Sequence, residues 1–140
     1  HLRFYSTAPG TVEVRHTIPE NFQGYPGVVQ GGIVAAMLDE AAGRSHMGGE
    51  NPRFMFTAKL EIRYRQNVPV GQPLRLVGVA GKGRGRSATA TAYIYDAQDQ
   101  LLAEAEALLV DVPQSMLPDA DMEALGWRVY TDEEIERGAV

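Results

Sequence analysis

Residues 25–44 read YPGVVQGGIVAAMLDEAAGR and contain the predicted central helix of the chain. From Ile33 to Ala42 the stretch has neither Pro nor Gly, and Ala, Met, Leu and Glu are good helix formers. Gly43 is the predicted stop signal. Apolar side chains cover most of the circumference of this helix, so we expect it to be buried rather than laid on a surface.

Two carboxylates lie in this apolar helix. Glu40 has Arg44 four residues further on, which is the better orientation for an i,i+4 ion pair. Asp39 has no local partner, and a carboxylate in an apolar helix is costly unless another segment meets it or it borders a water-filled cleft. Asp39 is therefore either a structural group, bound to a backbone amide or paired across an interface, or part of an active site.

Two glycines, Gly31 and Gly32, stand at the start of the helix. Because they have no side chains, a carbonyl or an anion can approach their N–H groups closely at the positive end of the helix dipole. The alternative is a glycine pair that is required only for tight packing. Amide donors at the start of the helix and an acid roughly two turns further along form a candidate active-site pairing.

The composition excludes several classes of function. At 140 residues, 44% hydrophobic and 22% charged, the chain is expected to form one globular domain without a membrane span. The absence of Cys excludes disulfides, thiolate metal sites and cysteine nucleophiles, and it agrees with the cytoplasmic location that we expect. The three His residues lack metal-ligand spacing, so no metal is predicted. A net charge of −5 argues against nucleic-acid binding.

Hydrophobic alternation predicts an antiparallel sheet around the helix. Residues 1–10 are expected to be an irregular lead-in, and the predicted strands are 11–18, 54–68, 74–80, 87–96 and 101–112. In the second strand, the even-numbered residues from Phe54 to Tyr64 are assigned to one face and the odd-numbered residues to the other. The predicted fold class is α+β, with one long central helix wrapped by a curved antiparallel sheet of five to six strands.

Residues 114–140 are predicted to be a helical extension of the domain formed by residues 1–113, rather than a separate domain. Thr131 and Glu134 form a capping-box pattern, and Trp127 and Tyr130 are expected to dock this tail. One helix cannot cover both faces of the sheet, so another copy of the chain should cover a face or an edge. The expected assembly is a homodimer, or a tetramer formed by two dimers.

The segment GYPGVVQGGIVAAMLDEA, residues 24–41, resembles the signature of hotdog-fold acyl-CoA thioesterases of the phenylacetate-pathway type. RYRQNVPVG (residues 63–71) and GKGRGR (residues 81–86) are similar to the second strand of that family and to the loop between its third and fourth strands. The resemblance covers residues 24–112 and leaves the tail outside it. It implies a helix inside a curled sheet, a dimer with one continuous sheet, and active sites between protomers.

The resemblance also implies a reaction, the hydrolysis of an acyl-CoA thioester to a free acid and coenzyme A. Asp39 would act as general base or as nucleophile, and the N–H of Gly31 or Gly32 would polarise the thioester carbonyl. Because coenzyme A is part of the substrate, no separate cofactor is expected.

Two positions depart from the family pattern. Gln30 stands where His is common, and Gln keeps a donor and an acceptor but cannot take up a proton near neutral pH. Gly24 stands where many members have Asn, with Gln23 beside it as a replacement. These departures favour the alternative of a non-catalytic module that binds acyl-CoA as a sensor or carrier. A dehydratase is disfavoured because His46, the next His after Asp39, lies past the predicted helix end.

A glycine-rich basic loop is predicted between the third and fourth of these strands. Its residues Lys82, Gly83, Arg84 and Arg86 are expected to hold the phosphates of coenzyme A, with Arg65 adding to the positive field. The loop is neither a dinucleotide fingerprint nor a P-loop, because no helix follows it. The alternative is a solvated hairpin whose charges keep a sheet edge soluble.

Overall fold

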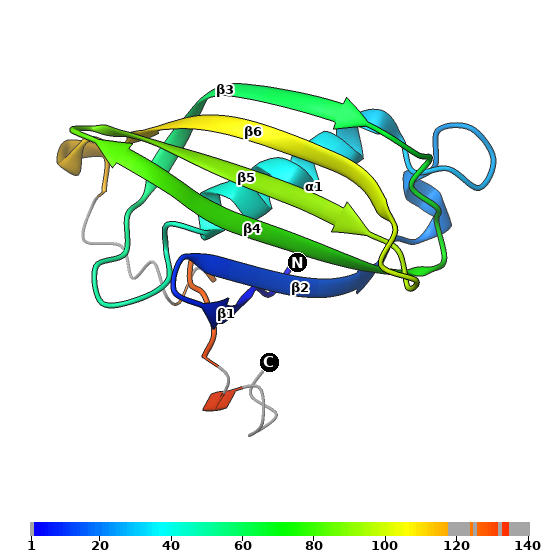
Figure 1. The fold of residues 1–140 in the computed structure, drawn as a ribbon, viewed down its shortest axis with the longest axis horizontal. Helices are drawn as coiled ribbons and strands as arrows, with labels where there is room; N and C mark the ends of the chain where they lie inside the picture. The colour runs from blue at the N-terminus through cyan, green and yellow to red at the C-terminus, as the bar shows by residue number, and fades with distance from the viewer. Residues whose placement is uncertain (1, 118–123, 125, 132, 135–140) are drawn as a thin grey trace.

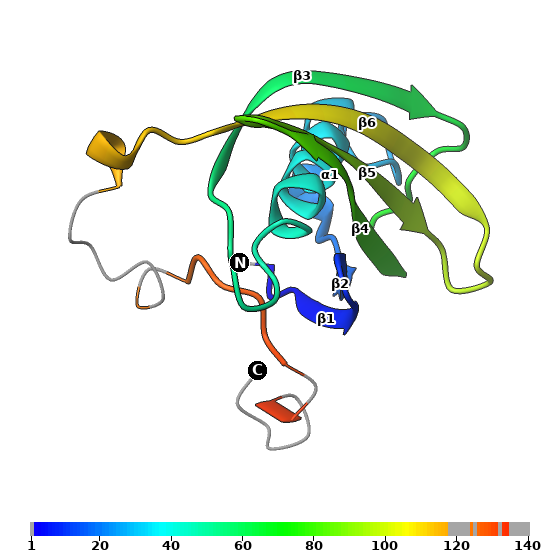
Figure 2. The ribbon, with the colours of Figure 1, turned by 60° about the vertical axis from the view of Figure 1, so that its left-hand side comes forward.

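The computed structural model describes residues 2–117, 124, 126–131, 133 and 134. These residues form one long helix and one six-stranded antiparallel sheet with the strand order β1-β2-β4-β5-β6-β3. The helix is α1 (Gly31–Arg44), and the strands are β1 (Tyr5–Ala8), β2 (Thr11–Thr17), β3 (Met55–Tyr64), β4 (Pro73–Arg84), β5 (Ser87–Tyr95) and β6 (Leu101–Asp111). The sheet curves around α1 (Figures 1 and 2). This confirms the predicted α+β arrangement. Within the described residues, no helix is long and apolar enough to cross a membrane.

Helix α1 presents only one face to the sheet within a single chain. The buried apolar residues of this face follow the helical period and are Val34, Met37, Leu38, Ala41 and Ala42. On the opposite side Ala36 is exposed, and Asp39 and Glu40 are half-buried. Within a single chain, the expectation that the helix is buried rather than laid on a surface therefore holds for one face only.

The helix does not stop at Gly43. It continues to Arg44, and Ser45 caps its C-terminal end. Glycine in a helix costs only about 0.5–1 kcal/mol relative to alanine, and the last turn gains the predicted ion pair between Arg44 and Glu40, whose Nη2–Oε1 distance is 2.7 Å. Together with the bonds of Arg44 to the carbonyls of Gly126 and Arg128, this ion pair outweighs the local preference for a stop at Gly43.

A glycine in β4 sets how closely α1 approaches the sheet. A Cβ atom added to Gly78 would collide with the carbonyl oxygen of Ala41, which belongs to the backbone of α1. The buried residues of β5 and β6 on the same concave face include several alanines. Small residues on the sheet therefore let the helix backbone lie close to it, as dense core packing requires.

Strand β3 contains a bulge that changes which residues face the helix. Its register with β6 shifts between Thr57 and Lys59, so Ala58 is the extra residue. Before the bulge Thr57 faces α1, and after it Leu60 packs against the core on that side. The assignment of all even-numbered residues to one face is therefore wrong, and Phe56 is 46% exposed.

Two segments differ from the strand prediction. Residues 5–8 form β1, an edge strand, rather than an irregular lead-in, because they pair with β2. The prediction missed this strand because these residues carry little hydrophobic alternation of their own. The predicted loop at residues 81–86 is mostly the end of β4, and only Gly85 and Arg86 form the turn. The register shifts between Ala80 and Gly83, which makes this end of the hairpin irregular.

The described part of the tail returns to the N-terminal edge of the sheet. After a short 3₁₀ turn (Gln114–Met116), most of the predicted helix over residues 116–125 lies outside the described residues. Tyr130 pairs with Tyr5 of β1. Its N–H donates to the carbonyl of Phe4 at 2.8 Å, and its carbonyl accepts from the N–H of Ser6 at 2.9 Å. The capping box is confirmed, since the Thr131 N–H donates to the Glu134 carboxylate at 2.8 Å.

Two glycine-to-alanine substitutions should have opposite effects on stability. Gly78→Ala forces a Cβ atom against the backbone of α1 and should lower the free energy of unfolding by about 1–3 kcal/mol. Gly43→Ala meets nothing within 4 Å and should raise it by about 0.5–1 kcal/mol. Urea denaturation measures both, and equal effects of the two substitutions would contradict this account of the helix–sheet contact.

Candidate active site

Gln30 is the N-cap of α1. Its side-chain Oε1 accepts a hydrogen bond from the N–H of Ile33 at 3.1 Å, while its own N–H donates to the carbonyl of Phe22 at 2.9 Å. A Cβ atom at position 32 would lie 2.8 Å from this Oε1, so Gly32 leaves the space in which the cap forms. The Gln30 side chain is therefore held in place, and its amide nitrogen remains available as a donor.

The N–H groups of Gly31 and Gly32 have no acceptor among the described residues. The first N–H groups of a helix cannot be satisfied within it, and here the cap engages the third one, that of Ile33. Both glycines are exposed. Two unpaired amides at the positive end of a helix are suited to bind a carbonyl oxygen that gains negative charge.

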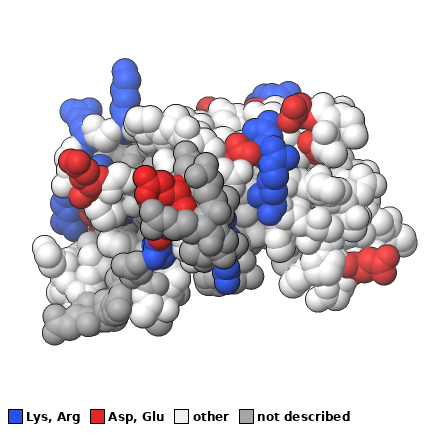
Figure 3. Space-filling model, turned by 90° about the horizontal axis from the view of Figure 1, so that it is seen from below, with Lys and Arg blue, Asp and Glu red and all other residues white. Residues whose placement is uncertain are grey.

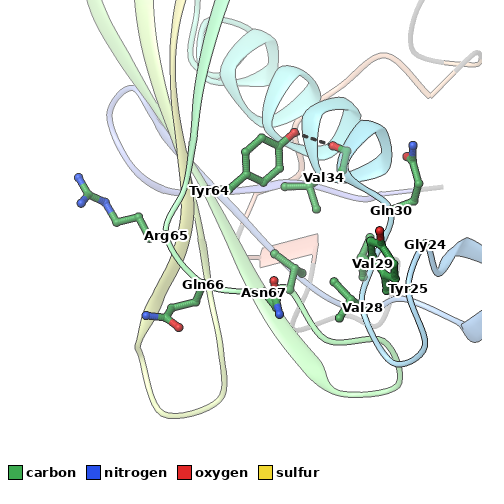
Figure 4. Close-up of a pocket in the computed structure, with 12 residues that line it drawn as sticks. Gly24, Tyr25, Val28, Val29, Gln30, Val34, Tyr64, Arg65, Gln66 and Asn67 are labelled. Carbon is green, nitrogen blue, oxygen red and sulfur yellow. Dashed lines mark hydrogen bonds between the residues drawn. The ribbon is translucent and has the colours of Figure 1, made fainter.

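A cavity of about 640 Å³ opens at the start of α1 (Figure 4), and Gly31 is one of its lining residues. It is lined by the loop before α1, by the first turn of the helix and by the end of β3 with the residues that follow it. The Tyr64 hydroxyl donates to the carbonyl of Gly31 at 2.7 Å and so fixes the end of β3 to the helix start. Sequence reasoning missed Tyr64 and Asn67 as cavity residues, because only the fold places them opposite the glycines.

The other residues predicted near the helix start have partners of their own. Gln23 Oε1 accepts from the N–H of Gly27 at 3.0 Å and closes the loop, while Gly24 lines the cavity. Arg65 also borders the cavity, but its guanidinium pairs with Glu104 at 2.9 Å. The hydrogen bond from Arg65 lowers the pKa of the Glu104 carboxyl. The charge of Arg65 is thus already compensated within the chain.

Asp39 meets a partner from another segment of the chain. The Thr57 hydroxyl donates to Oδ1 of Asp39 at 2.6 Å, and Oδ2 has no protein donor among the described residues. The bulge in β3 places Thr57 on this side, as bulges often do next to functional sites. Asp39 lines a separate small cavity of about 190 Å³ between α1 and the start of β3.

The predicted phosphate-binding residues lie at the same end of the sheet as Asp39. Gly83 is connected to Thr57 by the pairing row Gly83, Ala88, Leu109 and Thr57 across four strands. Lys82, Arg84 and Arg86 are exposed around the β4–β5 turn. Arg53, held by Asp111 at 2.8 Å, contacts the carbonyl of Gly85 and braces this turn.

The predicted site residues thus form two groups in a single chain. One group lies at the start of α1 and consists of Gln23, Gly24, Gln30, Gly31, Gly32 and Arg65. Asp39 and the basic residues lie toward the β4–β5 turn. The start of α1 and the β4–β5 turn are at opposite ends of the sheet (Figure 1). Asp39 is eight residues after Gly31, or about 12 Å along the helix axis. Gly31 and Asp39 also line different cavities. One chain does not bring the amides and the acid together.

Charges of both signs lie next to each other on the face shown in Figure 3, where the coloured Lys and Arg side chains do not form one continuous basic area.

In the described residues, His, Asp and Glu side chains form no group of three that could hold a metal ion.

Comparisons with known proteins agree with this architecture. A solved thioesterase superfamily protein has 31% sequence identity to the chain and a TM-score of 0.73, and the match covers 78% of this chain and 55% of that protein. This chain therefore spans little more than half the length of that relative. A search of curated proteins found no match.

Two more distant structures have the same fold. Thioesterase superfamily member 2 of zebra fish has 20% identity and a TM-score of 0.72, and the match covers 79% of this chain and 81% of that one. A Streptococcus mutans protein bound to acetyl CoA has 17% identity and a TM-score of 0.72, with 80% and 89% covered. The fold is the hotdog fold. Residues 26–103 match the thioesterase superfamily. The chain belongs to the thioesterase superfamily.

Proposed function

We propose that this protein hydrolyses acyl-CoA thioesters in an active site formed by two copies of the chain. The observation that carries the proposal is the separation of two groups along α1. The amides of Gly31 and Gly32, which have no acceptor among the described residues, lie about 12 Å before the Asp39 carboxylate on the helix axis. Family membership supports thioester hydrolysis as the reaction, and the acetyl CoA in the Streptococcus mutans structure supports acyl-CoA as the substrate.

The amides would stabilise the oxyanion of the reaction. Attack on a thioester carbonyl produces a tetrahedral intermediate with a negative oxygen, and the N–H groups of Gly31 and Gly32 would bind that oxygen. Because Gln30 uses Oε1 as the helix cap, its Nε2 is the side-chain group that would orient the thioester. Gln30 then has a positioning role and needs no proton transfer.

Asp39 would activate the attacking water or attack the carbonyl itself. Thr57 holds Oδ1, which leaves Oδ2 to accept a proton from water or to attack the carbonyl itself. General-base catalysis is typically worth about 10²–10⁴-fold in rate. Both routes use the same oxygen, so the proposal covers Asp39 as general base or as nucleophile.

A homodimer would unite the two groups. In the described residues β3 pairs only with β6, so its other edge is open, whereas Tyr130 pairs with β1 at the opposite side of the sheet. Antiparallel pairing of β3 with the same strand of a second copy would create a continuous sheet and two antiparallel α1 helices. The start of one helix would then approach Asp39 of the other copy. A two-fold axis makes two such sites.

Coenzyme A would be bound through its phosphates. Lys82, Arg84 and Arg86 surround the glycine-containing turn at the Asp39 end of the sheet, and Gly83 keeps the backbone accessible there. We propose Gln23, Gly24 and Arg65 as contacts at the helix start. Gly24 and Arg65 line the larger cavity, and Gln23 closes the loop next to Gly24. Five further points stay predictions from the sequence. They are the phenylacetate-pathway subtype, the tail 114–140 as an extension of the 1–113 domain, the lack of a separate cofactor, the pairing of two dimers into a tetramer, and the cytoplasmic location.

Replacing Asp39 should abolish most turnover. Asp39→Asn keeps the size of the side chain and an acceptor for Thr57 but removes the charge, so kcat should fall by about 10²–10⁴-fold. Release of free thiol from short, medium, long and aromatic acyl-CoAs measures the rate. Glu61→Gln, which removes an exposed carboxylate from β3, is the control. Wild-type binding of acyl-CoA without turnover would instead support the sensor or carrier alternative, which Gln30 favours.

Removing one amide should slow the reaction without disturbing the helix. Proline is tolerated at the first helical position, and Gln30 already has the extended backbone (φ −59°, ψ 135°) that a residue before proline prefers. Gly31→Pro should therefore lower kcat by about 10²–10³-fold, while Gly31→Ala, which keeps the N–H, should change it little. Equal rates for the two variants would remove Gly31 as an oxyanion donor.

A mixed dimer should regain activity lost in both parents. If Gly31 of one copy works with Asp39 of the other, a dimer of Gly31→Pro and Asp39→Ala chains has one intact and one doubly damaged site. Heterodimers purified through two different tags should then have about half of the wild-type activity. A heterodimer as inactive as its parents would mean that the two groups act within one chain.

A further inference from the structure

The described part of the tail is attached to the helix that carries Asp39. Arg44, at the end of α1, is only 5% exposed. Its Nη1 donates to the carbonyl of Gly126 at 3.0 Å and to the carbonyl of Arg128 at 2.8 Å. These two residues stand on either side of Trp127, and the Arg44 guanidinium lies 5.6 Å from the centre of the indole ring.

Glu40 completes this attachment from the helix. Its Oε1 accepts from Nε of Arg44 at 2.8 Å and lies 2.7 Å from Nη2. The guanidinium is thus bound by the helix on one side and by the tail backbone on the other. Bonds that use several donors of one guanidinium fix its geometry, so the position of Trp127 relative to Asp39 is set by α1 itself.

Trp127 stands between two cavities. The Asp39 cavity of about 190 Å³ and a neighbouring cavity of about 380 Å³ are both lined by Glu40, Arg44 and Trp127. The first is otherwise mainly apolar, with Met47, Phe54, Met55 and Phe56. The second continues along the outer face of α1 over Ile33, Ala36 and Met37 to Leu2. The indole and its anchor therefore form a partition between two apolar spaces.

We propose that Trp127 is a specificity-determining residue that limits the length of the acyl group, with Arg44 as the residue that positions it. This inference rests on the proposed function, in which the thioester lies at Asp39. A straight acyl chain would enter the small apolar cavity and end against the indole. Without the indole, the chain would continue into the second cavity, which is about twice as large as the first.

The size of the expected effect follows from the chemistry of apolar pockets. One methylene that is accommodated or rejected in a hydrophobic pocket changes kcat/KM by roughly 10–200-fold. Trp127→Ala should therefore raise kcat/KM for long-chain acyl-CoAs relative to short-chain ones by about tenfold or more. Trp127→Phe keeps an aromatic wall and should retain most of the wild-type preference.

The test uses a series of saturated acyl-CoAs of increasing chain length with the full-length protein. The dissociation constant is measured by calorimetry for Asp39→Asn chains with and without Trp127→Ala. The value of kcat/KM is measured for chains that keep Asp39, again with and without Trp127→Ala. Met116→Ala is the matched control, because Met116 is a 59% exposed apolar side chain that lines neither cavity. Arg44→Met, which keeps the indole but removes its anchor, should shift the chain-length profile in the same direction as Trp127→Ala.

The outcomes separate this inference from the proposed function. A shift toward longer chains in the dissociation constants supports the inference even if no acyl-CoA is hydrolysed, a result that would overturn only the proposed function. Turnover with an unchanged chain-length profile in Trp127→Ala would overturn the inference and leave the proposed function intact. Light scattering measures the oligomeric state of Trp127→Ala. A changed oligomeric state with an unchanged chain-length profile would also overturn the inference, and it would identify Trp127 as a contact between copies.

Discussion

The close contact between α1 and the concave face of the sheet is the constraint on which the rest of the structure depends. Gly78 leaves room for the carbonyl of Ala41, and buried alanines of β5 and β6, among them Ala92 and Ala105, complete a face of small side chains. A helix that lies so close to the sheet is fixed in height and rotation, because side-chain packing at this density tolerates little displacement. The orientation of α1 therefore determines which of its residues face away from the sheet.

This orientation places the candidate catalytic groups of α1 on the side of the helix that faces away from the core. Gln30 caps the helix and leaves the amides of Gly31 and Gly32 without an acceptor in the part of the chain that the structure describes, while Asp39 faces β3 and accepts from Thr57. The bulge in β3 is essential here, since without the shift at Ala58 a different side chain would face the carboxylate. The amides and the acid share one rigid helix, so a second copy with an antiparallel helix is the simplest way to bring them to one substrate.

The described part of the tail is held to the domain by a residue of α1. Arg44 binds the backbone on both sides of Trp127, and Glu40 holds Arg44 from the previous turn. The same helix thus carries the candidate oxyanion donors at its start, the candidate catalytic acid in its middle and the anchor of the tail at its end. Packing α1 against the sheet positions all three at once, which links the stability of the fold directly to the geometry of the site.

Features that depend on neighbouring residues could be predicted from local sequence patterns. Helix formers over residues 33–42, the Glu40–Arg44 spacing, the capping box at Thr131 and the alternating strands each predicted their element. The lack of a local partner for Asp39 predicted that another segment meets it or that it borders a cleft. Other features became evident only in the folded chain: the strand at residues 5–8, the helix beyond Gly43, the bulge at Ala58, and the places of Tyr64 and Trp127 beside the cavities. These features arise from contacts between segments far apart in the chain, and local propensities of a fraction of a kcal/mol to about 1 kcal/mol are too weak to oppose them.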